Sequence, residues 1–312
     1  MLLFTRQKQR KQDMYDVIIL GSGPAGLTGA IYTARANKKT LIIAGDTLGG
    51  QTGEIANLEN FPGYNGSGMN WIQLVLKQAT GFGAEINYTT ATDIKFNDDK
   101  TFSVVCDNGK TFDAKTVILA TGARARRLEI EGAREFFGRG VSYCATCDGF
   151  FYSGRDVLIV GGGNAALNDA LYLADVAKNV TIVYRKPEFF RAEAVIRKRV
   201  AERQNIKSIF NTELKSIAQK DGSDKLIATT TDGNEIETDG IFVAIGHEAN
   251  TDYLSEKIKR DELGRIIPSS LPTGMFVAGD VCSEIKMQIA TAVGTGCNAA
   301  MDAIAYLNAK DK

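Results

Sequence analysis

The feature that most constrains the fold is a succession of strand, glycine-rich turn, helix and strand that occurs twice along the chain. The first copy fills residues 16–45, where the apolar run DVIIL leads into GSGPAG, a helical pattern and a second apolar run, TLIIAG. The second copy fills residues 157–185, where VLIV leads into GGGNAA, another helical pattern and the run VTIVYR. This order is typical of a βαβ unit, so the sequence predicts two such units.

Each copy is followed by alternating, strand-like segments, at 102–122 after the first and at 225–246 after the second. The turn sequences DNG and DGN inside these segments predict β-hairpins. The two segments also end alike, in ATG at 120–122 and in AIG at 244–246. We therefore expect an internal duplication of a dinucleotide-binding fold.

The predicted fold class is α/β, with two Rossmann-like, three-layer ββα dinucleotide-binding domains, the second inserted into the first. Residues 14–123 and 248–312 would form the first domain, and residues 124–247 the second. Only two connections would then join the domains, near Ala123 and near His247, and two connections make relative rotation easy.

The first glycine turn matches the pattern G-x-G-x-x-G through Gly21, Gly23 and Gly26. The first glycine permits a tight turn, the second lets a pyrophosphate approach the backbone, and the third lets helix and strand pack closely. An acidic residue about 20 positions further on usually binds the ribose. Here the next strand ends at 43–45 and Asp46 follows it, which departs from the general pattern.

The stretch CATCDG places Cys144 and Cys147 in a C-x-x-C motif, with Asp148 directly after it. A structural zinc site needs four ligands, so zinc would require partners outside this motif. The other candidate ligands are Cys106, Cys282, Cys297 and His247. They show no second C-x-x-C or C-x-x-H spacing, so no metal is expected. In a redox dithiol, by contrast, one thiolate attacks a disulfide, the second thiol resolves it, and a nearby carboxyl group can act as general acid.

The composition restricts the class of protein. Lys plus Arg and Asp plus Glu are both 37, so no net charge draws the whole chain to nucleic acid or to an anionic membrane. No apolar run of about 18 residues predicts a membrane span. Five cysteines among 312 residues are too few for a disulfide scaffold, which favours a reducing cytoplasm. Residues 1–13 lack the order of a signal peptide and are interpreted as a frayed tail, with Met1 or Met14 as the start.

A resemblance to a known family joins these motifs. The chain resembles the low-molecular-weight, bacterial-type thioredoxin reductases over about residues 14–308. The motifs that carry the resemblance follow the family's order: GSGPAG, LGGQ, LENFPG, ATGA, CATCDGFFY, GGGNAALNDALYL and GMFVAGDV. The resemblance implies FAD in the first domain, a nicotinamide nucleotide in the second domain together with the C-x-x-C, a homodimer, and thioredoxin as the partner.

The resemblance also implies roles for individual residues. Cys147 would face the flavin, Cys144 would attack thioredoxin, and Asp148 would be the acid. The implied flavin site comprises Gly21, Gly23, Pro24, Ala25, Gly26, Gly49, Gly50, Gln51, Asn60, Ala120, Thr121, Gly122, Gly279, Asp280, Gln288 and Ile289. The family often has Arg-Gln-Ala where this chain has Met287-Gln288-Ile289, so a charge near the flavin is missing.

The second glycine turn predicts the electron donor. It fits G-x-G-x-x-A, and the implied nucleotide residues are Gly161, Gly163, Asn164, Ala165 and Ala166. The cations Arg185, Lys186 and Arg191 lie at and after the end of the following strand, where an acid would bind a 2′-hydroxyl. Cations suit a 2′-phosphate, which favours NADPH over NADH.

Two alternatives stay open at this stage. The family's NADPH-using members typically carry His-Arg-Arg where this chain has Tyr184-Arg185-Lys186, and lysine cannot reproduce bidentate arginine contacts. The same disulfide reductase could therefore use ferredoxin or another donor. A flavin redox sensor without turnover is the alternative from a different functional class.

Overall fold

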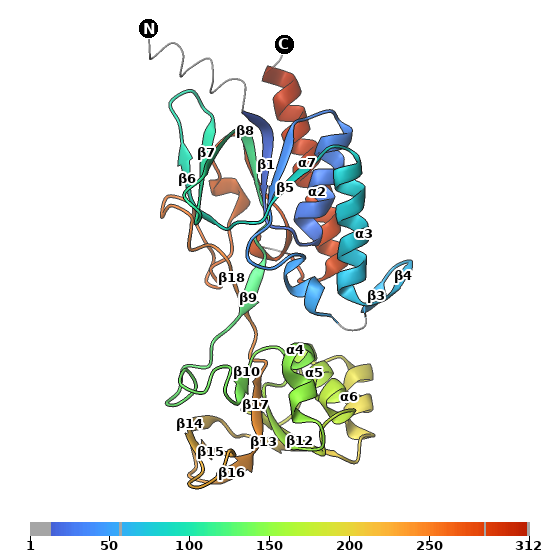
Figure 1. The fold of residues 1–312 in the computed structure, drawn as a ribbon, viewed down its shortest axis with the longest axis vertical. Helices are drawn as coiled ribbons and strands as arrows, with labels where there is room; N and C mark the ends of the chain where they lie inside the picture. The colour runs from blue at the N-terminus through green and yellow to red at the C-terminus, as the bar shows by residue number, and fades with distance from the viewer. Residues whose placement is uncertain (1–13, 56–57, 284, 311–312) are drawn as a thin grey trace. The chain divides into compact units, whose positions relative to one another are not determined.

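The computed structural model describes residues 14–55, 58–283 and 285–310. The expectations for residues 1–13 lie outside the described residues. The described chain divides into two compact units (Figure 1). The first contains the described residues up to Arg124 and those from Glu248 onward, and the second contains Ala125–His247.

The first unit is built on a sheet with the order β5-β2-β1-β8-β7-β6, in which β19 also pairs with β8. The strands β5, β2, β1, β8 and β19 pair in parallel, whereas β6, β7 and β8 form an antiparallel meander. The strand bounds are β1 Tyr15–Leu20, β2 Thr40–Ile43, β5 Glu85–Asn87, β6 Ala91–Phe96, β7 Phe102–Cys106, β8 Thr111–Leu119 and β19 Met275–Val277.

Three helices cover one face of this sheet, and the β6–β7 hairpin lies on the other side (Figure 1). The helices are α2 Pro24–Arg35, α3 Gly68–Gly81 and α7 Ile289–Lys310. Alternate residues of β1 explain the layering, because Val17 and Ile19 pack in the helix-side core and Ile18 and Leu20 in the core on the opposite face. A strand buried on both faces is expected to be apolar throughout, as this one is. The smaller elements are η1 Gly50–Glu54, β3 Leu58–Phe61, β4 Tyr64–Gly66, η3 Pro268–Ser270 and η4 Gly279–Val281.

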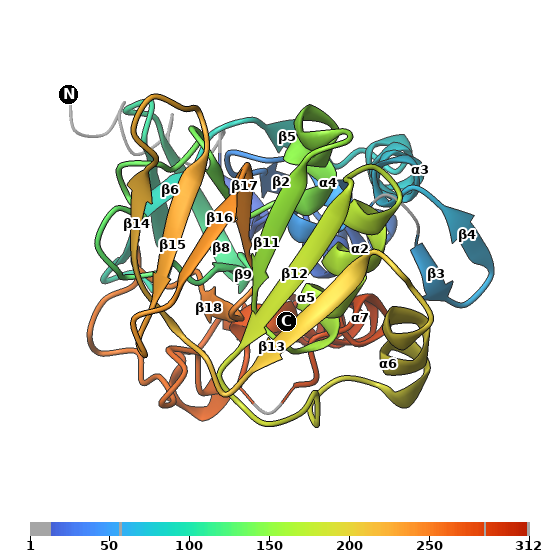
Figure 2. The ribbon, with the colours of Figure 1, turned by 90° about the horizontal axis from the view of Figure 1, so that it is seen from below.

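The second unit repeats this plan with a parallel sheet in the order β10-β17-β11-β12-β13 and a separate meander, β14-β15-β16 (Figure 2). The strand bounds are β10 Val141–Ser142, β11 Asp156–Val160, β12 Asn179–Tyr184, β13 Ile206–Phe210, β14 Leu214–Gln219, β15 Leu226–Thr230, β16 Glu235–Thr238 and β17 Gly240–Val243. Its helices are α4 Ala145–Asp148, η2 Gly149–Tyr152, α5 Asn164–Ala174 and α6 Ala194–Ala201.

The internal duplication is confirmed, because β2-β1-β8 with α2 corresponds to β12-β11-β17 with α5. Both predicted hairpins are confirmed as well, since β7 pairs antiparallel with β8 and β15 with β16. The chain leaves the first unit and returns to it within β9 (Ala123–Ala125) and β18 (His247–Ala249), which pair with each other. In the described part of the chain, no helix combines the length and the hydrophobicity that crossing a membrane requires.

Candidate active site

Cys144 and Cys147 form a disulfide at the start of α4, with their Cα atoms 5.3 Å apart. Cys144 is half-buried and caps the helix, and its Sγ accepts the backbone N–H of Cys147 at 3.2 Å. Cys147 is exposed. A hydrogen bond to the charged form of a group favours that form, so opening this disulfide would leave the better stabilised thiolate on Cys144.

Asp148 is held by a serine that sequence reasoning missed. Ser142, which is buried on β10, donates its hydroxyl to Asp148 Oδ2 at 2.6 Å. The same hydroxyl oxygen accepts the backbone N–H of Cys144 at 3.0 Å. Ser142 therefore connects the carboxyl group to the backbone of the redox motif, and no local sequence signal distinguishes it from an ordinary strand serine.

The glycine of CATCDG fixes the motif against α5. A Cβ atom added to Gly149 would lie 2.9 Å from both Leu173 Cδ2 and Tyr172 Cε1, so a larger residue would require these two side chains to shift. The segment that carries the disulfide is thereby packed against α5, the helix that begins at the second glycine turn. Burial, and then the charge of Asp148, raise the pKa of the neighbouring Tyr152 phenol, which keeps this phenol protonated.

Two aromatic side chains next to the disulfide are unusually exposed. Phe150 and Phe151 lie in η2 with 75% and 72% of their surface accessible, and their rings contact each other edge to face at 6.5 Å. Large exposed apolar groups of this kind mark sites where another molecule binds. Adjacent phenylalanines after a C-x-x-C motif are a signal that sequence analysis could have used.

The first glycine turn has the geometry expected of a phosphate-binding turn. Gly21 has φ +111°, and a Cβ atom there would lie 2.2 Å from the Ala120 carbonyl oxygen. A Cβ on Gly26 would lie 2.0 Å from the Gly21 carbonyl oxygen. At Gly23, which precedes Pro24 at the start of α2, an added Cβ would meet, among the described residues, only the Gly49 carbonyl oxygen, at 3.8 Å. The turn is therefore tightly packed at Gly21 and Gly26 and open at Gly23, next to the helix N-terminus, where anions bind.

Hydrogen bonds bring together the segments of the predicted flavin site. The Gly49 N–H donates to Ser22 Oγ at 3.1 Å, and Gln51 Nε2 donates to the Ala123 carbonyl at 2.7 Å. Asn60 Nδ2 donates to Gln288 Oε1 at 3.3 Å, across 228 positions of sequence. Thr121, in the ATG segment, donates its hydroxyl to the Asn250 carbonyl at 2.8 Å.

Asp280 supplies a half-buried carboxylate that has no partner among the described residues. Its neighbour Gly279 lies at the first turn, since an added Cβ there would be 2.9 Å from Ala25 Cβ. Burial raises the pKa of the Asp280 carboxyl group above its usual 3.8. Among the described residues, no hydrogen bond or ion pair to this carboxylate is formed. A half-buried carboxylate that lacks donors fits a ligand rich in hydroxyl groups, as the ribityl chain of FAD is.

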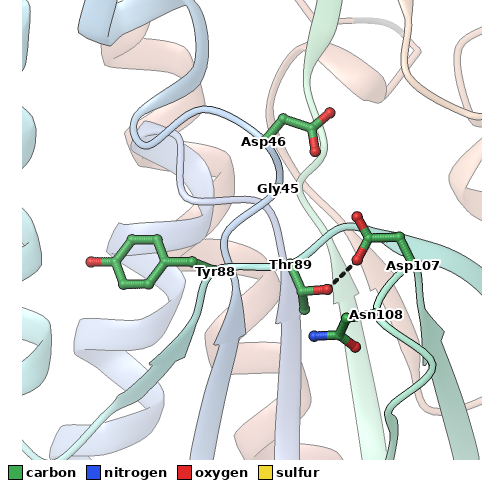
Figure 3. A pocket seen from close by; sticks show the side chains of 6 residues that line it. All are labelled: Gly45, Asp46, Tyr88, Thr89, Asp107 and Asn108. Atoms are coloured by element: carbon green, nitrogen blue, oxygen red, sulfur yellow. Dashed lines mark hydrogen bonds between the residues drawn. The ribbon is translucent and has the colours of Figure 1, made fainter.

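A hollow of about 420 Å³ lies beside the C-terminal ends of β2 and β5, where doubly wound sheets bind ligands (Figure 3). It is lined by Gly45, Asp46, Tyr88, Thr89, Asp107 and Asn108. The two carboxylates are occupied within the protein, because Asp46 accepts the hydroxyl of Thr90 and Asp107 accepts that of Thr89.

The second glycine turn repeats the geometry of the first. Gly161 has φ +145°, and its added Cβ would lie 2.2 Å from the Ala244 carbonyl oxygen, as Gly21 does against Ala120. Gly163 precedes α5, and an added Cβ there would meet no atom of the described chain within 4 Å. Ala166 is fully buried, which suits its packing role in the motif, whereas Ala165 is exposed.

The predicted nucleotide cations lie on the segment that follows β12. Arg185 forms an exposed ion pair with Glu213 at 3.7 Å, and Arg191 lies over the Phe190 ring at 5.6 Å. Asn164 uses both ends of its amide on Glu193, a residue that sequence analysis did not single out.

Comparisons with known proteins show the family to which the chain belongs. The sequence profile of the family described as "Pyridine nucleotide-disulphide oxidoreductase" matches residues 15–296. A thioredoxin reductase of Rickettsia conorii is 39% identical over 312 residues, covering 94% of this chain and 98% of the relative. A thioredoxin reductase of Listeria innocua is 38% identical over 308 residues and covers 95% of each.

Two solved structures resemble the fold closely. The crystal structure of Lactococcus lactis thioredoxin reductase has a TM-score of 0.86 and 35% identity, covering 95% of this chain and 99% of that chain. The T. acidophilum thioredoxin reductase has a TM-score of 0.85 and 34% identity, covering 94% and 98%. The chain therefore belongs to the pyridine nucleotide-disulphide oxidoreductases and, within them, to the bacterial-type thioredoxin reductases.

Proposed function

We propose that the protein reduces the disulfide of thioredoxin through Cys144 and Cys147, with NADPH as electron donor and FAD as bound electron carrier. The observation that carries the proposal is the disulfide between these two cysteines, built on the same unit as the second glycine turn. A homodimer and a cytoplasmic location stay predictions, which follow from the resemblance and from the cysteine usage.

The residues around the reduced pair would perform a thiol–disulfide exchange. The Cys144 thiolate, stabilised by the N–H of Cys147, attacks one sulfur of the thioredoxin disulfide and releases the other sulfur as a thiolate. Asp148 would protonate that leaving thiolate. Cys147 then attacks the Cys144 sulfur of the mixed disulfide, and the proton of the Cys147 thiol passes to the departing thioredoxin sulfur. Thioredoxin leaves as a dithiol with two electrons and two protons, one proton from Asp148 and one from Cys147, and the Cys144–Cys147 disulfide is restored.

The first unit would hold FAD, which when bound supplies a carrier of two electrons. The open turn at Gly23 would take the pyrophosphate, and Asp280 would accept hydrogen bonds from ribityl hydroxyls. The hydrogen bond between Asn60 and Gln288 would fix the two loops that carry these residues.

The second unit would bind NADPH. Its turn at Gly163 is open, and no acid ends β12 to bind a 2′-hydroxyl. Cations follow that strand instead, which supports a 2′-phosphate on the adenosine ribose.

The test is an anaerobic titration of the purified, FAD-loaded protein with NADPH, followed by addition of oxidised thioredoxin. We expect bleaching of the flavin absorbance, then its recovery together with thiols on thioredoxin. A protein that cannot be loaded with FAD would contradict the proposal. A flavin that NADPH does not reduce but ferredoxin does would change the proposed electron donor only. Flavin reduction without formation of thiols on thioredoxin would favour the redox sensor.

A further inference from the structure

We propose that Asn164 and Glu193 are positioning residues that hold the cationic segment after β12 at the start of α5, and that this contact gives the second unit its preference for a 2′-phosphate. The inference rests on the proposed use of NADPH. It assigns the preference for a 2′-phosphate to a contact between an uncharged asparagine and an acidic glutamate, in addition to the cations.

The contact is reciprocal. Asn164 Nδ2 donates to Glu193 Oε1 at 2.7 Å, and the Glu193 backbone N–H donates to Asn164 Oδ1 at 2.8 Å. Both residues lie at the start of a helix, since Asn164 is the first residue of α5 and Glu193 occupies the N-cap position of α6. Neither side chain caps its own helix, so the pair spans 29 positions of sequence to join two helix N-termini. We call this pair the Asn164–Glu193 clasp.

The other end of the segment is anchored by aromatic packing. Phe189 is buried, stacks on Tyr184 at 5.7 Å between ring centroids, and meets the Phe210 ring edge to face at 4.8 Å. Tyr184 in turn lies directly against Gly162 of the glycine turn, because an added Cβ there would be 2.4 Å from the Tyr184 ring. The segment is therefore fixed at Phe189 and again at Glu193.

Arg191 lies between these two fixed points. It is exposed, stacks on Phe190, and forms no ion pair with any carboxylate of the described chain. The guanidinium thus stays available, and the clasp two residues later holds its backbone beside the α5 N-terminus. An arginine positioned in advance loses less conformational entropy when it binds a phosphate, which raises affinity for that phosphate specifically.

The clasp also uses an acid next to a site for phosphates. At residue 193 the clasp needs only a side-chain oxygen that accepts from Asn164 Nδ2 and a backbone N–H that donates to Asn164 Oδ1, and a glutamine offers both. The negative charge itself would oppose a bound phosphate. Glu193→Gln therefore separates the positioning role from the charge.

The experiment is a binding titration of the oxidised, FAD-loaded full chain with 2′,5′-ADP and with 5′-AMP, repeated with NADP⁺ and NAD⁺. We expect Asn164→Ala and Glu193→Ala to weaken 2′,5′-ADP and NADP⁺ by about five- to tenfold, as the loss of one or two hydrogen bonds implies, with less than about a twofold change for 5′-AMP and NAD⁺. Glu193→Gln should bind the phosphorylated ligands at least as tightly as the wild type. In turnover, the KM for NADPH should rise while kcat stays within about twofold.

Glu202→Ala and Glu202→Gln are the matched controls, because Glu202 is an exposed glutamate that follows α6 and pairs with Lys198, away from the clasp. The inference is overturned if Asn164→Ala and Glu193→Ala bind 2′,5′-ADP like the wild type. It is also overturned if they lose NAD⁺ and NADP⁺ equally, since that pattern indicates a contact with the pyrophosphate. A wild-type protein that binds neither 2′-phosphate ligand would instead contradict the NADPH donor itself.

Discussion

The hydroxyl of Ser142 donates a 2.6 Å hydrogen bond to Asp148 Oδ2 and accepts the backbone N–H of Cys144 at 3.0 Å. A buried serine on β10 therefore joins the carboxyl group that would act as acid to the cysteine that would attack. This relationship makes the position of Asp148 depend on a residue outside the C-x-x-C motif.

We predict that Ser142→Ala lowers the rate of thioredoxin reduction by about three- to tenfold, because one hydrogen bond to a charged group and one to a backbone N–H are lost. Reduction of ferricyanide, which can take electrons without the dithiol, should be unchanged. Ser208→Ala, at an exposed position on β13 of the same unit, is the control. Equal rates for both variants would mean that Ser142 does not position Asp148.

A second prediction concerns the exposed pair Phe150 and Phe151. Replacing both with alanine should raise the KM for thioredoxin by about tenfold, because exposed aromatic residues supply much of the binding energy at protein interfaces. Activity with a small aromatic disulfide should change by less than about twofold. Val195→Ala, at an exposed apolar position on α6, should leave both activities unchanged. A loss with both substrates would show that the phenylalanines support the disulfide and do not bind the partner.

For Asp280, function and stability should change in opposite directions. Asp280→Asn should weaken FAD binding by about tenfold or more, because a charged acceptor for hydroxyl groups is lost. The apoprotein should become more stable near neutral pH, because burial penalises the charged carboxylate in the folded state.

The pH dependence gives the sign of this effect. A raised folded-state pKa means that the folded apoprotein binds the proton more tightly, so its stability falls as pH rises from the unfolded value near 3.8 through the raised value. This slope should disappear in Asp280→Asn when urea unfolding is compared over that range. An unchanged slope, or an apoprotein destabilised at neutral pH, would show that Asp280 is not a desolvated anion.

The single histidine allows a direct titration. Burial lowers the pKa of His247 below its usual 6.5, so the neutral form is favoured in the folded state. The contribution of His247 to stability is therefore complete above pH 6.5 and is lost as the pH falls through the interval down to the lowered value. One set of imidazole signals in an NMR titration should have a midpoint below 6.5. A midpoint at or above the usual value would contradict this assignment.

Local sequence was sufficient for the parts of the fold that are encoded locally. The glycine turns could be predicted because Gly21 and Gly161 stand between an apolar strand and a helix, and the structure places both against a strand-end carbonyl. The C-x-x-C motif was equally visible, and its two cysteines form the disulfide. The hairpins followed from short turn signals between alternating residues.

The contacts that position these motifs were not visible in the sequence. Asn60 and Gln288 are 228 positions apart, and nothing in the sequence around either one specifies the other. Asn164 was predicted as a cofactor residue from its place in the motif, but its hydrogen bonds with Glu193 could not be predicted. Such pairs join residues that are distant in sequence. The tertiary structure brings them together, and a local sequence pattern does not specify this.

The central claim is that Cys144 attacks a protein disulfide and Cys147 resolves it. The most direct measurement uses thioredoxin that retains only its attacking cysteine, loaded with thionitrobenzoate, and follows release of the coloured thiol by Cys147→Ser and by Cys144→Ser. We predict that Cys147→Ser releases the thiol and forms a covalent complex with thioredoxin, and that Cys144→Ser reacts slower by about tenfold or more, because its remaining thiol lacks the stabilising N–H. Equal rates for the two variants, or full NADPH-dependent thioredoxin reduction by either, would contradict the account.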